Sequence, residues 1–156
     1  MTLSKKVLLI ALILSILLTL FFIFSNSMKS PDRSMEESNN ATDKIEEVVS
    51  PETSIGAFLS TYLRKIAHFL EFALLGYEVF LLVSFYFGLR PAYFVSSLLF
   101  GVLTAVLDET VQITSGRGSS VIDVWIDVSG YFFAAFAGAL LFAVIRRIKT
   151  YRGAKR

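Results

Sequence analysis

Four long apolar runs limit this chain of 156 residues to a membrane-embedded helical fold. The runs cover residues 7–24, 62–87, 92–113 and 122–145, and each is long enough for a helix across a hydrocarbon core of about 30 Å. Hydrophobic residues make up 54% of the chain and are collected in these runs, which argues against a soluble globule. We therefore expect an all-α fold, a four-helix transmembrane bundle that forms a single domain over residues 1–156.

The first run allows two interpretations, a retained membrane helix or a cleaved signal peptide. Lys5 and Lys6 precede it, as in either case. The run is longer than the apolar part of an ordinary signal peptide, and no Ala-x-Ala-like cleavage site follows it, although Ser25-Asn26-Ser27 is a weak substitute. We expect the helix to be retained as a membrane span.

The segments between the runs differ in length and charge. Residues 25–61 hold seven acids against three bases, which indicates an acidic loop outside the membrane, with a short helix near residues 43–49. The linkers 88–91 and 114–121 are short, and short linkers make neighbouring helices run antiparallel.

Basic residues predict the orientation of the bundle in the cell membrane. Lys5, Lys6, Arg90 and the tail 146–156, which carries six bases and no acid, lie on one side if the helices alternate in direction. Bases near membrane helices favour the cytoplasmic side, so we expect both termini inside and the acidic loop outside. This tail is typical of a topology signal and not of a nucleic-acid-binding arm. The chain has no cysteine, which excludes disulfides and thiolate metal sites.

Ionisable residues gather at one end of three of the runs, the end that the predicted orientation places in the outer leaflet. Charged groups this close to hydrocarbon cost a few kcal/mol each unless they are paired or functional. The group consists of Arg64, Lys65, His68 and Glu71 in the second run, Asp108, Glu109 and Gln112 in the third, Arg117 in the turn after it, and Asp123 and Asp127 in the fourth.

The spacing of these residues predicts a shared site. Three- and four-residue intervals place each set on one helical face, and these faces should turn toward one another and away from lipid. His68 is the expected acid–base group. We predict that the catalytic candidates are His68, Glu71, Asp108, Glu109, Asp123 and Asp127, and that Arg64, Gln112 and Arg117 bind the ligand.

The glycine-rich turn 115–120 adds a second prediction. Its backbone N–H groups and the Arg117 guanidinium could converge on an anion such as a phosphate, although Arg117 could instead pair with Asp108 or Asp123. A serine nucleophile is a weaker alternative. Its only nearby candidates are Ser115, Ser119 and Ser120.

Other interpretations of these polar residues remain open. Ion pairs could simply lock the helix ends together, and Lys65 fits an interfacial anchor. One histidine with several carboxylates would suit Mg²⁺, Mn²⁺ or Ca²⁺ better than structural zinc, but we predict no metal ligands among these residues, and the sequence indicates no particular cofactor. Glu78, deeper in the second run, is either the partner of a hydroxyl such as that of Tyr77 or Ser97 or part of a proton path. Gly130, Ala134 and Gly138 form a small-residue seam for helix packing.

Three motifs resemble those of the VanZ-like membrane protein family. They are Arg64-Lys65-x-x-His68-Phe69-x-Glu71-Phe72-x-x-Leu75-Gly76, then Asp108-Glu109-x-x-Gln112, then Arg117-Gly118-x-x-x-x-Asp123-x-x-x-Asp127-x-x-Gly130. The Phe-Ile-Phe-Ser-Asn-Ser end of the first run is also similar to that family, although Asn26 stands where members often have Gln. Glu78 lies outside these motifs. The resemblance implies a membrane protein of the cell envelope, and the family's namesake is linked to low-level resistance to the glycopeptide teicoplanin.

Three functional hypotheses follow from the residues and the resemblance. The first is an outer-leaflet site that binds or modifies an anionic lipid or a lipid-linked cell-wall intermediate and influences glycopeptide susceptibility. The second is a non-enzymatic scaffold whose polar cluster is structural. The third, which depends mainly on Glu78, is a small ion or proton transporter.

Overall fold

The computed structural model describes residues 2–50, 52–118 and 120–153, and over these residues it contains helices and no strands. The predicted all-α fold is confirmed, because four of the helical stretches are long and apolar enough to cross a membrane. The elements are α1 (Leu3–Ser27), α2 (Pro31–Glu46), α3 (Ser54–Leu82), which continues into the π-helix η1 (Val83–Phe87), α4 (Pro91–Thr114) and α5 (Val121–Gly153).

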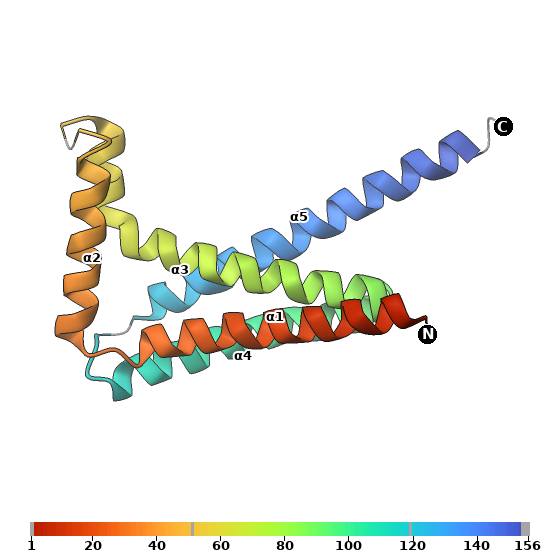
Figure 1. The fold of residues 1–156 in the computed structure, drawn as a ribbon, viewed down its shortest axis with the longest axis horizontal. Helices are drawn as coiled ribbons and strands as arrows, with labels where there is room; N and C mark the ends of the chain where they lie inside the picture. Colours follow the sequence, from red (N-terminus) through yellow and green to blue (C-terminus); the bar gives the residue numbers. More distant parts are fainter. Residues whose placement is uncertain (1, 51, 119, 154–156) are drawn as a thin grey trace.

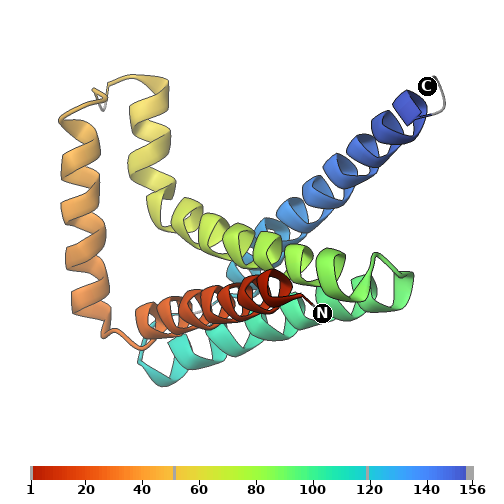
Figure 2. The same ribbon diagram turned by 45° about the vertical axis from the view of Figure 1, so that its right-hand side comes forward.

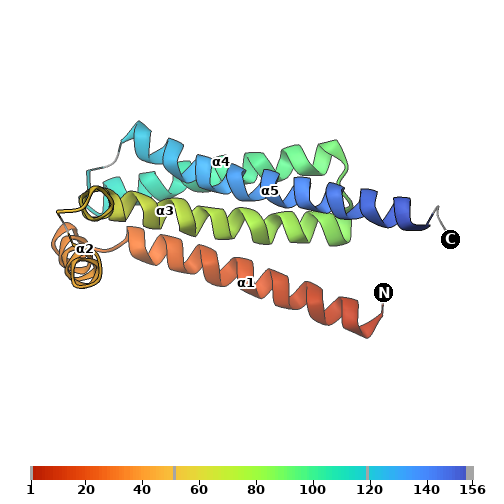
Figure 3. The same ribbon diagram turned by 90° about the horizontal axis from the view of Figure 1, so that it is seen from above.

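Helices α1, α3 and α4 run alongside one another, α5 crosses α3 obliquely and diverges from it toward its C-terminal end, and α2 lies across the other end of the bundle (Figures 1 and 2). Both chain termini are at the opposite end, so successive long helices alternate in direction as the short linkers predicted (Figures 1 and 3). This topology collects Lys5, Arg90 and the basic end of α5 at the terminal end of the bundle. The polar ends of α3, α4 and α5 lie at the α2 end.

The long segment between the first two spans is more ordered than predicted. Residues 25–61 were expected to form a loop with a short helix near residues 43–49, but α2 occupies residues 31–46 instead. The N-terminal signals of this helix explain the difference: Ser30 accepts a hydrogen bond from the backbone N–H of Arg33, Pro31 occupies the first turn, and Asp32 complements the helix dipole.

Helix α3 begins at Ser54, before the predicted residue 62, and it is bent (Figures 1 and 2). Its first turns run beside α2 and the rest joins the bundle. The hydroxyl of Ser60 donates to the carbonyl of Gly56, and that of Thr61 donates to the carbonyl of Ala57 at 2.7 Å. Such bonds to the preceding turn bend helices, so the membrane-directed part of α3 starts close to the predicted boundary.

Glycines allow α3 and α5 to pack closely. A Cβ atom on Gly76 would overlap the backbone of Tyr131, and one on Gly130 would overlap the backbone of Phe69. Gly138 likewise faces the ring of Phe80, so the predicted packing role of Gly130 and Gly138 is confirmed. The buried Tyr131 hydroxyl donates to the Ser97 carbonyl at 2.8 Å and thereby links α5 to α4.

The terminal end of the bundle has one further difference from the prediction. The basic segment 146–156 was expected as a tail, but α5 continues through it to Gly153, and Arg146 lies over the ring of Phe142. Nearby, the Tyr86 hydroxyl of η1 donates to the Lys5 carbonyl at 2.6 Å. Of the described basic residues at this end, Lys5, Lys6, Arg146, Arg147, Lys149 and Arg152 therefore lie on helices.

Candidate functional site

A buried polar cluster occupies the α2 end of the bundle. Its fully or nearly fully buried side chains come from three helices and the turn after α4: Ser27 of α1, Asp108, Glu109 and Gln112 of α4, Asp127 of α5, and Arg117. Helix α3 adds His68 and Glu71, which are partly buried, and Arg64, which is exposed. The structure thus brings together the residues that the sequence grouped on separate helix ends.

Gln112 is the hydrogen-bonding centre of the cluster. Its carbonyl oxygen accepts a bond from Arg64 Nη2 at 3.0 Å. Its amide nitrogen donates to Asp108 Oδ2 and to Glu109 Oε1, both at 2.9 Å. Because an amide offers both a donor and an acceptor, this one side chain joins a cation on α3 to two carboxylates on α4.

Two residues of α1 belong to the cluster although the sequence analysis did not select them. Ser27 donates from its hydroxyl to Asp108 Oδ1 at 2.5 Å, and Asn26 donates from its side-chain amide to Glu71 Oε1 at 3.1 Å. The available signal was the change from an apolar run to Ser25-Asn26-Ser27 at the same membrane face as the predicted site.

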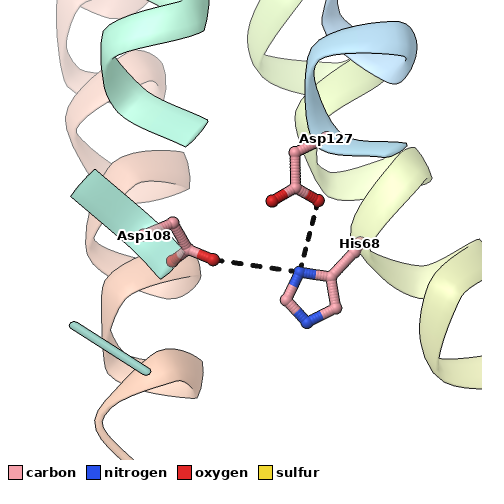
Figure 4. Close-up of side chains that lie close together, drawn as sticks. All are labelled: His68, Asp108 and Asp127. Carbon is pink, nitrogen blue, oxygen red and sulfur yellow. Dashed lines mark ion pairs between the residues drawn. The ribbon is translucent and has the colours of Figure 1, made fainter. Parts of the chain in front are cut away.

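His68 faces two carboxylates from different helices (Figure 4). Its Nδ1 atom lies 3.5 Å from Asp127 Oδ1 and 3.9 Å from Asp108 Oδ2, both longer than an ordinary hydrogen bond. Asp127 is fully buried, and neither of its oxygens accepts a hydrogen bond from the described residues. A buried carboxylate in this state requires compensation from a positive charge or a proton.

The two arginines of the cluster contact neutral oxygens. Arg117 Nη1 donates to the carbonyl of Asn26 at 2.9 Å, and Arg64 donates to Gln112. Within the described part of the chain, neither guanidinium forms an ion pair with a carboxylate, so the predicted pairing of Arg117 with Asp108 or Asp123 is not formed. Burial, and after it the neighbouring charge of Arg64, lower the pKa of Arg117. The guanidinium nevertheless stays charged.

Three pockets adjoin these residues. One of about 190 Å³ lies between α2, α3 and the end of α1 and is bordered by Arg64, His68, Glu71 and Arg117. A second, of about 210 Å³, lies on the α5 side. Its lining includes Arg64, Lys65, His68, Glu109, Gln112, Asp123 and Asp127. A third, of about 290 Å³, separates α2 from Arg64, Arg117 and Gly118. Arg64 and His68 therefore border both of the first two pockets.

The turn after α4 serves mainly to end that helix. The N–H of Gly116 bonds to the carbonyl of Ile113, and the N–H of Arg117 bonds to the carbonyl of Gln112, with Gly116 at a φ of 75°. This pattern is a Schellman cap. The predicted convergence of backbone donors on an anion is therefore wrong for these two N–H groups, and the Arg117 guanidinium is what the turn supplies to the site.

The serines of this turn also cap helices. Ser115 donates to the Val111 carbonyl, and Ser120 forms reciprocal bonds with Asp123, whose backbone N–H donates to the Ser120 hydroxyl at 3.2 Å. Neither hydroxyl is bonded to His68, and Ser119 lies outside the described residues. Asp123 thus has a capping role in addition to its place at the second pocket.

Glu78 lies apart from the cluster and is buried between α1 and α3. Its Oε1 atom accepts a hydrogen bond from the hydroxyl of Ser15 at 2.5 Å. The hydroxyl-partner interpretation is consistent with this contact, although the expected partners Tyr77 and Ser97 were wrong.

A model of the VanZ/LLP1 protein family matches residues 8–146 of the chain. The match extends over all four apolar helices and includes every residue of the polar cluster. No curated protein and no solved structure matches the chain.

Proposed function

Because the chain belongs to the VanZ/LLP1 family of membrane proteins, we propose that it binds the anionic head group of an envelope lipid or lipid-linked cell-wall intermediate. The observation that carries this proposal is the pair of arginines, Arg64 and Arg117, at one pocket of about 190 Å³. Neither forms an ion pair with a carboxylate of the described residues, so both positive charges are available to a ligand.

The chemistry of the arginines favours a phosphate or carboxylate ligand. Guanidinium groups bind such anions through paired N–H donors, and Arg117 Nε is buried without a partner among the described residues. Two like charges at one pocket repel each other, and an anion between them would relieve that repulsion. A lipid supplies its anionic group at the end of the membrane spans, the level at which this pocket lies.

The outer leaflet is the proposed side of binding. Bases at the terminal end of the bundle favour a cytoplasmic location for that end, which leaves α2 and the pocket outside. Lipid-linked cell-wall intermediates are used on that face of the membrane. We also propose that the protein influences susceptibility to glycopeptides, because drugs of the teicoplanin type act on cell-wall material on that side of the membrane.

His68 is the residue that would act on a bound head group. It borders the arginine pocket, and its Nδ1 atom faces the carboxylates of Asp108 and Asp127 (Figure 4). An imidazole beside carboxylates can accept and return a proton near neutral pH. If the protein transforms its ligand, we assign general acid–base work to His68, with Glu71 and Glu109 as further carboxylates of the site.

The proposal is tested by extraction of the protein in native lipid and mass spectrometry of the lipids that remain bound. The wild type should retain an anionic envelope lipid, and Arg117→Ala and Arg64→Ala should lose it. Arg90→Ala is the matched control, because Arg90 is an exposed arginine at the opposite end of the bundle. Stable site variants with unchanged lipid content would disprove the anion site.

A structural scaffold is the second candidate, and one observation favours it. The bonds from Ser27, Arg64 and Gln112 join three helices around the carboxylates of α4, as structural polar contacts would. Under this function, Arg117→Ala and His68→Ala should lower the amount of folded protein in proportion to any loss of drug resistance. Loss of resistance at normal protein level would instead support a binding or catalytic role.

A further inference from the structure

We propose that His68, Asp108 and Asp127 bind one divalent cation. These residues come from α3, α4 and α5, and each offers one ligand atom, so that all three atoms lie within 4.8 Å of one another (Figure 4). Two donors on the same ion at about 2.1 Å are separated by roughly 3 Å in adjacent positions and roughly 4.2 Å in opposite ones. The distances of 3.5 and 3.9 Å from His68 Nδ1 to the aspartate oxygens fall within this range.

The same distances are too long for shared protons. A proton held between His68 and an aspartate would draw the two atoms to about 2.7–3.2 Å. Both oxygens of Asp127 are instead buried and accept no hydrogen bond from the described residues, although the side chain points toward the imidazole (Figure 4). The donor atoms of the three side chains are therefore spaced as the ligands of one cation are.

The charges around His68 also favour a bound cation. Asp108, Asp127 and Glu109 are almost completely buried, and Glu71 is partly so, while both arginines of the cluster donate to neutral oxygens. Burial of uncompensated carboxylates in a low-dielectric region is strongly unfavourable. A divalent ion at the centre of the three ligands would offset two of these negative charges.

Neighbouring side chains orient the carboxylate of Asp108 toward the imidazole. Ser27 donates to its Oδ1 and Gln112 to its Oδ2, at 2.5 and 2.9 Å. Each carboxylate oxygen has two acceptor sites, so Oδ2 can accept the amide and bind an ion at the same time. Outer hydrogen bonds of this kind fix the direction of ligands in protein metal sites.

The donor set indicates the class of ion. One imidazole nitrogen and two carboxylate oxygens, in a chain without cysteine, suit Mn²⁺ or a three-ligand Zn²⁺ site better than the all-oxygen environment of Ca²⁺. The second pocket, of about 210 Å³, borders His68 and Asp127 and leaves room for water or a ligand oxygen on the ion. The cation site does not depend on binding of an anionic head group.

Electron paramagnetic resonance with Mn²⁺ tests the site. The full chain, treated with a chelator and placed in bilayers of neutral phosphatidylcholine, should bind one Mn²⁺ per chain, measured as loss of the free-ion signal. Asp127→Asn and His68→Asn should each weaken binding at least tenfold. Glu78→Gln is the matched control, since Glu78 is also a buried carboxylate but lies outside the cluster, and it should bind Mn²⁺ as the wild type does.

The outcomes distinguish an ion site from a structural cluster. Failure of the wild type to bind one Mn²⁺, or equal binding by the wild type and folded Asp127→Asn, would overturn the proposal. If Asp127→Asn does not fold, the result for His68→Asn decides the test. The side chain of His68 is only partly buried, so its replacement should disturb folding less than that of Asp127. The neutral bilayer keeps this result separate from the head-group proposal. Mn²⁺ binding in that bilayer, together with no anionic lipid on the wild type after extraction in native lipid, would sink the proposed function and leave the cation site standing.

Discussion

Gln112 shows how much of the site depends on a single amide. It is 1% exposed and satisfies Arg64, Asp108 and Glu109 at once. Gln112→Ala should lower the free energy of unfolding by about 1–3 kcal/mol, because Asp108 and Glu109 then lose buried hydrogen bonds and Arg64 loses a partly buried one. Gln112→Glu should be at least as damaging, since it keeps an acceptor for Arg64 but places a third carboxylate beside two others. Reversible unfolding in mixed detergent micelles measures both changes.

The control for these variants is Thr110→Ala on the same helix. Thr110 is exposed, and its hydroxyl bonds only to the preceding turn, at the carbonyl of Val106. Its substitution should change the free energy of unfolding by less than about 0.5 kcal/mol. Equal stability of Gln112→Ala and Thr110→Ala would contradict a central role for the amide.

Glu78 provides a residue-scale test of the transporter hypothesis. Its carboxylate accepts a hydrogen bond from Ser15, and a glutamine can accept the same bond without carrying a proton. If the chain confers the proposed glycopeptide resistance, we expect Glu78→Gln to retain it together with a normal protein level, measured by inhibitory concentration and by immunoblot. Loss of resistance at normal level would favour proton movement through Glu78. Loss of both would mean that the charge itself stabilises the α1–α3 contact.

At the scale of helices, the close packing of α3 against α5 is the most sensitive feature. Gly76→Ala and Gly130→Ala should each destabilise the protein by about 1–3 kcal/mol or more, because the new Cβ overlaps rigid backbone of the facing helix. Gly118→Ala is the matched control, since no atom lies within 4 Å of a Cβ at that turn position. Unfolding in detergent measures the stability of the three variants. Equal free energies of unfolding for Gly76→Ala and Gly118→Ala would contradict the close packing of α3 on α5.

The attachment of α2 should depend on pH. Lys29, which precedes α2, donates a hydrogen bond to the carboxylate of Glu37 in that helix. This bond lowers the pKa of Glu37 below its ordinary value of 4.5. A lowered folded-state pKa stabilises the contact above pH 4.5, and this stabilisation is lost as the pH falls through the folded value. Protection of the α2 backbone amides from hydrogen exchange, corrected for the intrinsic exchange rate at each pH, should therefore fall more in acid for the wild type than for Glu37→Gln. Glu46→Gln, also exposed on α2, should behave as the wild type does.

Sequence patterns predicted the helices with different success because different forces define them. The apolar runs identified the four spans, since burial in lipid requires continuous hydrophobic helix. Helix α2 has no such run, and the local signals for it are the helix-starting residues Ser30, Pro31 and Asp32. The true start of α3 could not be predicted from hydropathy, because its first turns pack on α2 outside the span.

For the whole molecule, alternating helix direction was enough to predict that the polar helix ends meet. It could not predict which partners each side chain selects. Pairing of Arg117 with a carboxylate was one of the two alternatives, but Arg117 bonds to the Asn26 carbonyl instead, because the last turn of α1 lies beside the turn after α4. Three-dimensional contacts also brought in Ser27, whose polarity alone does not distinguish it from its neighbours in the sequence.

The orientation of the bundle is a property of the whole molecule and follows from its charge distribution. Lys5, Lys6 and Arg90 lie at the same end as the basic turns of α5, and the acidic α2 lies at the other. We expect both termini in the cytoplasm, because export of the clustered bases across the membrane is unfavourable. A fluorescent protein fused after Arg156 should fluoresce, and alkaline phosphatase at that position should be inactive. Phosphatase inserted near Asn40 in α2 should be active, and the reverse pattern of activities would place the polar site on the cytoplasmic face.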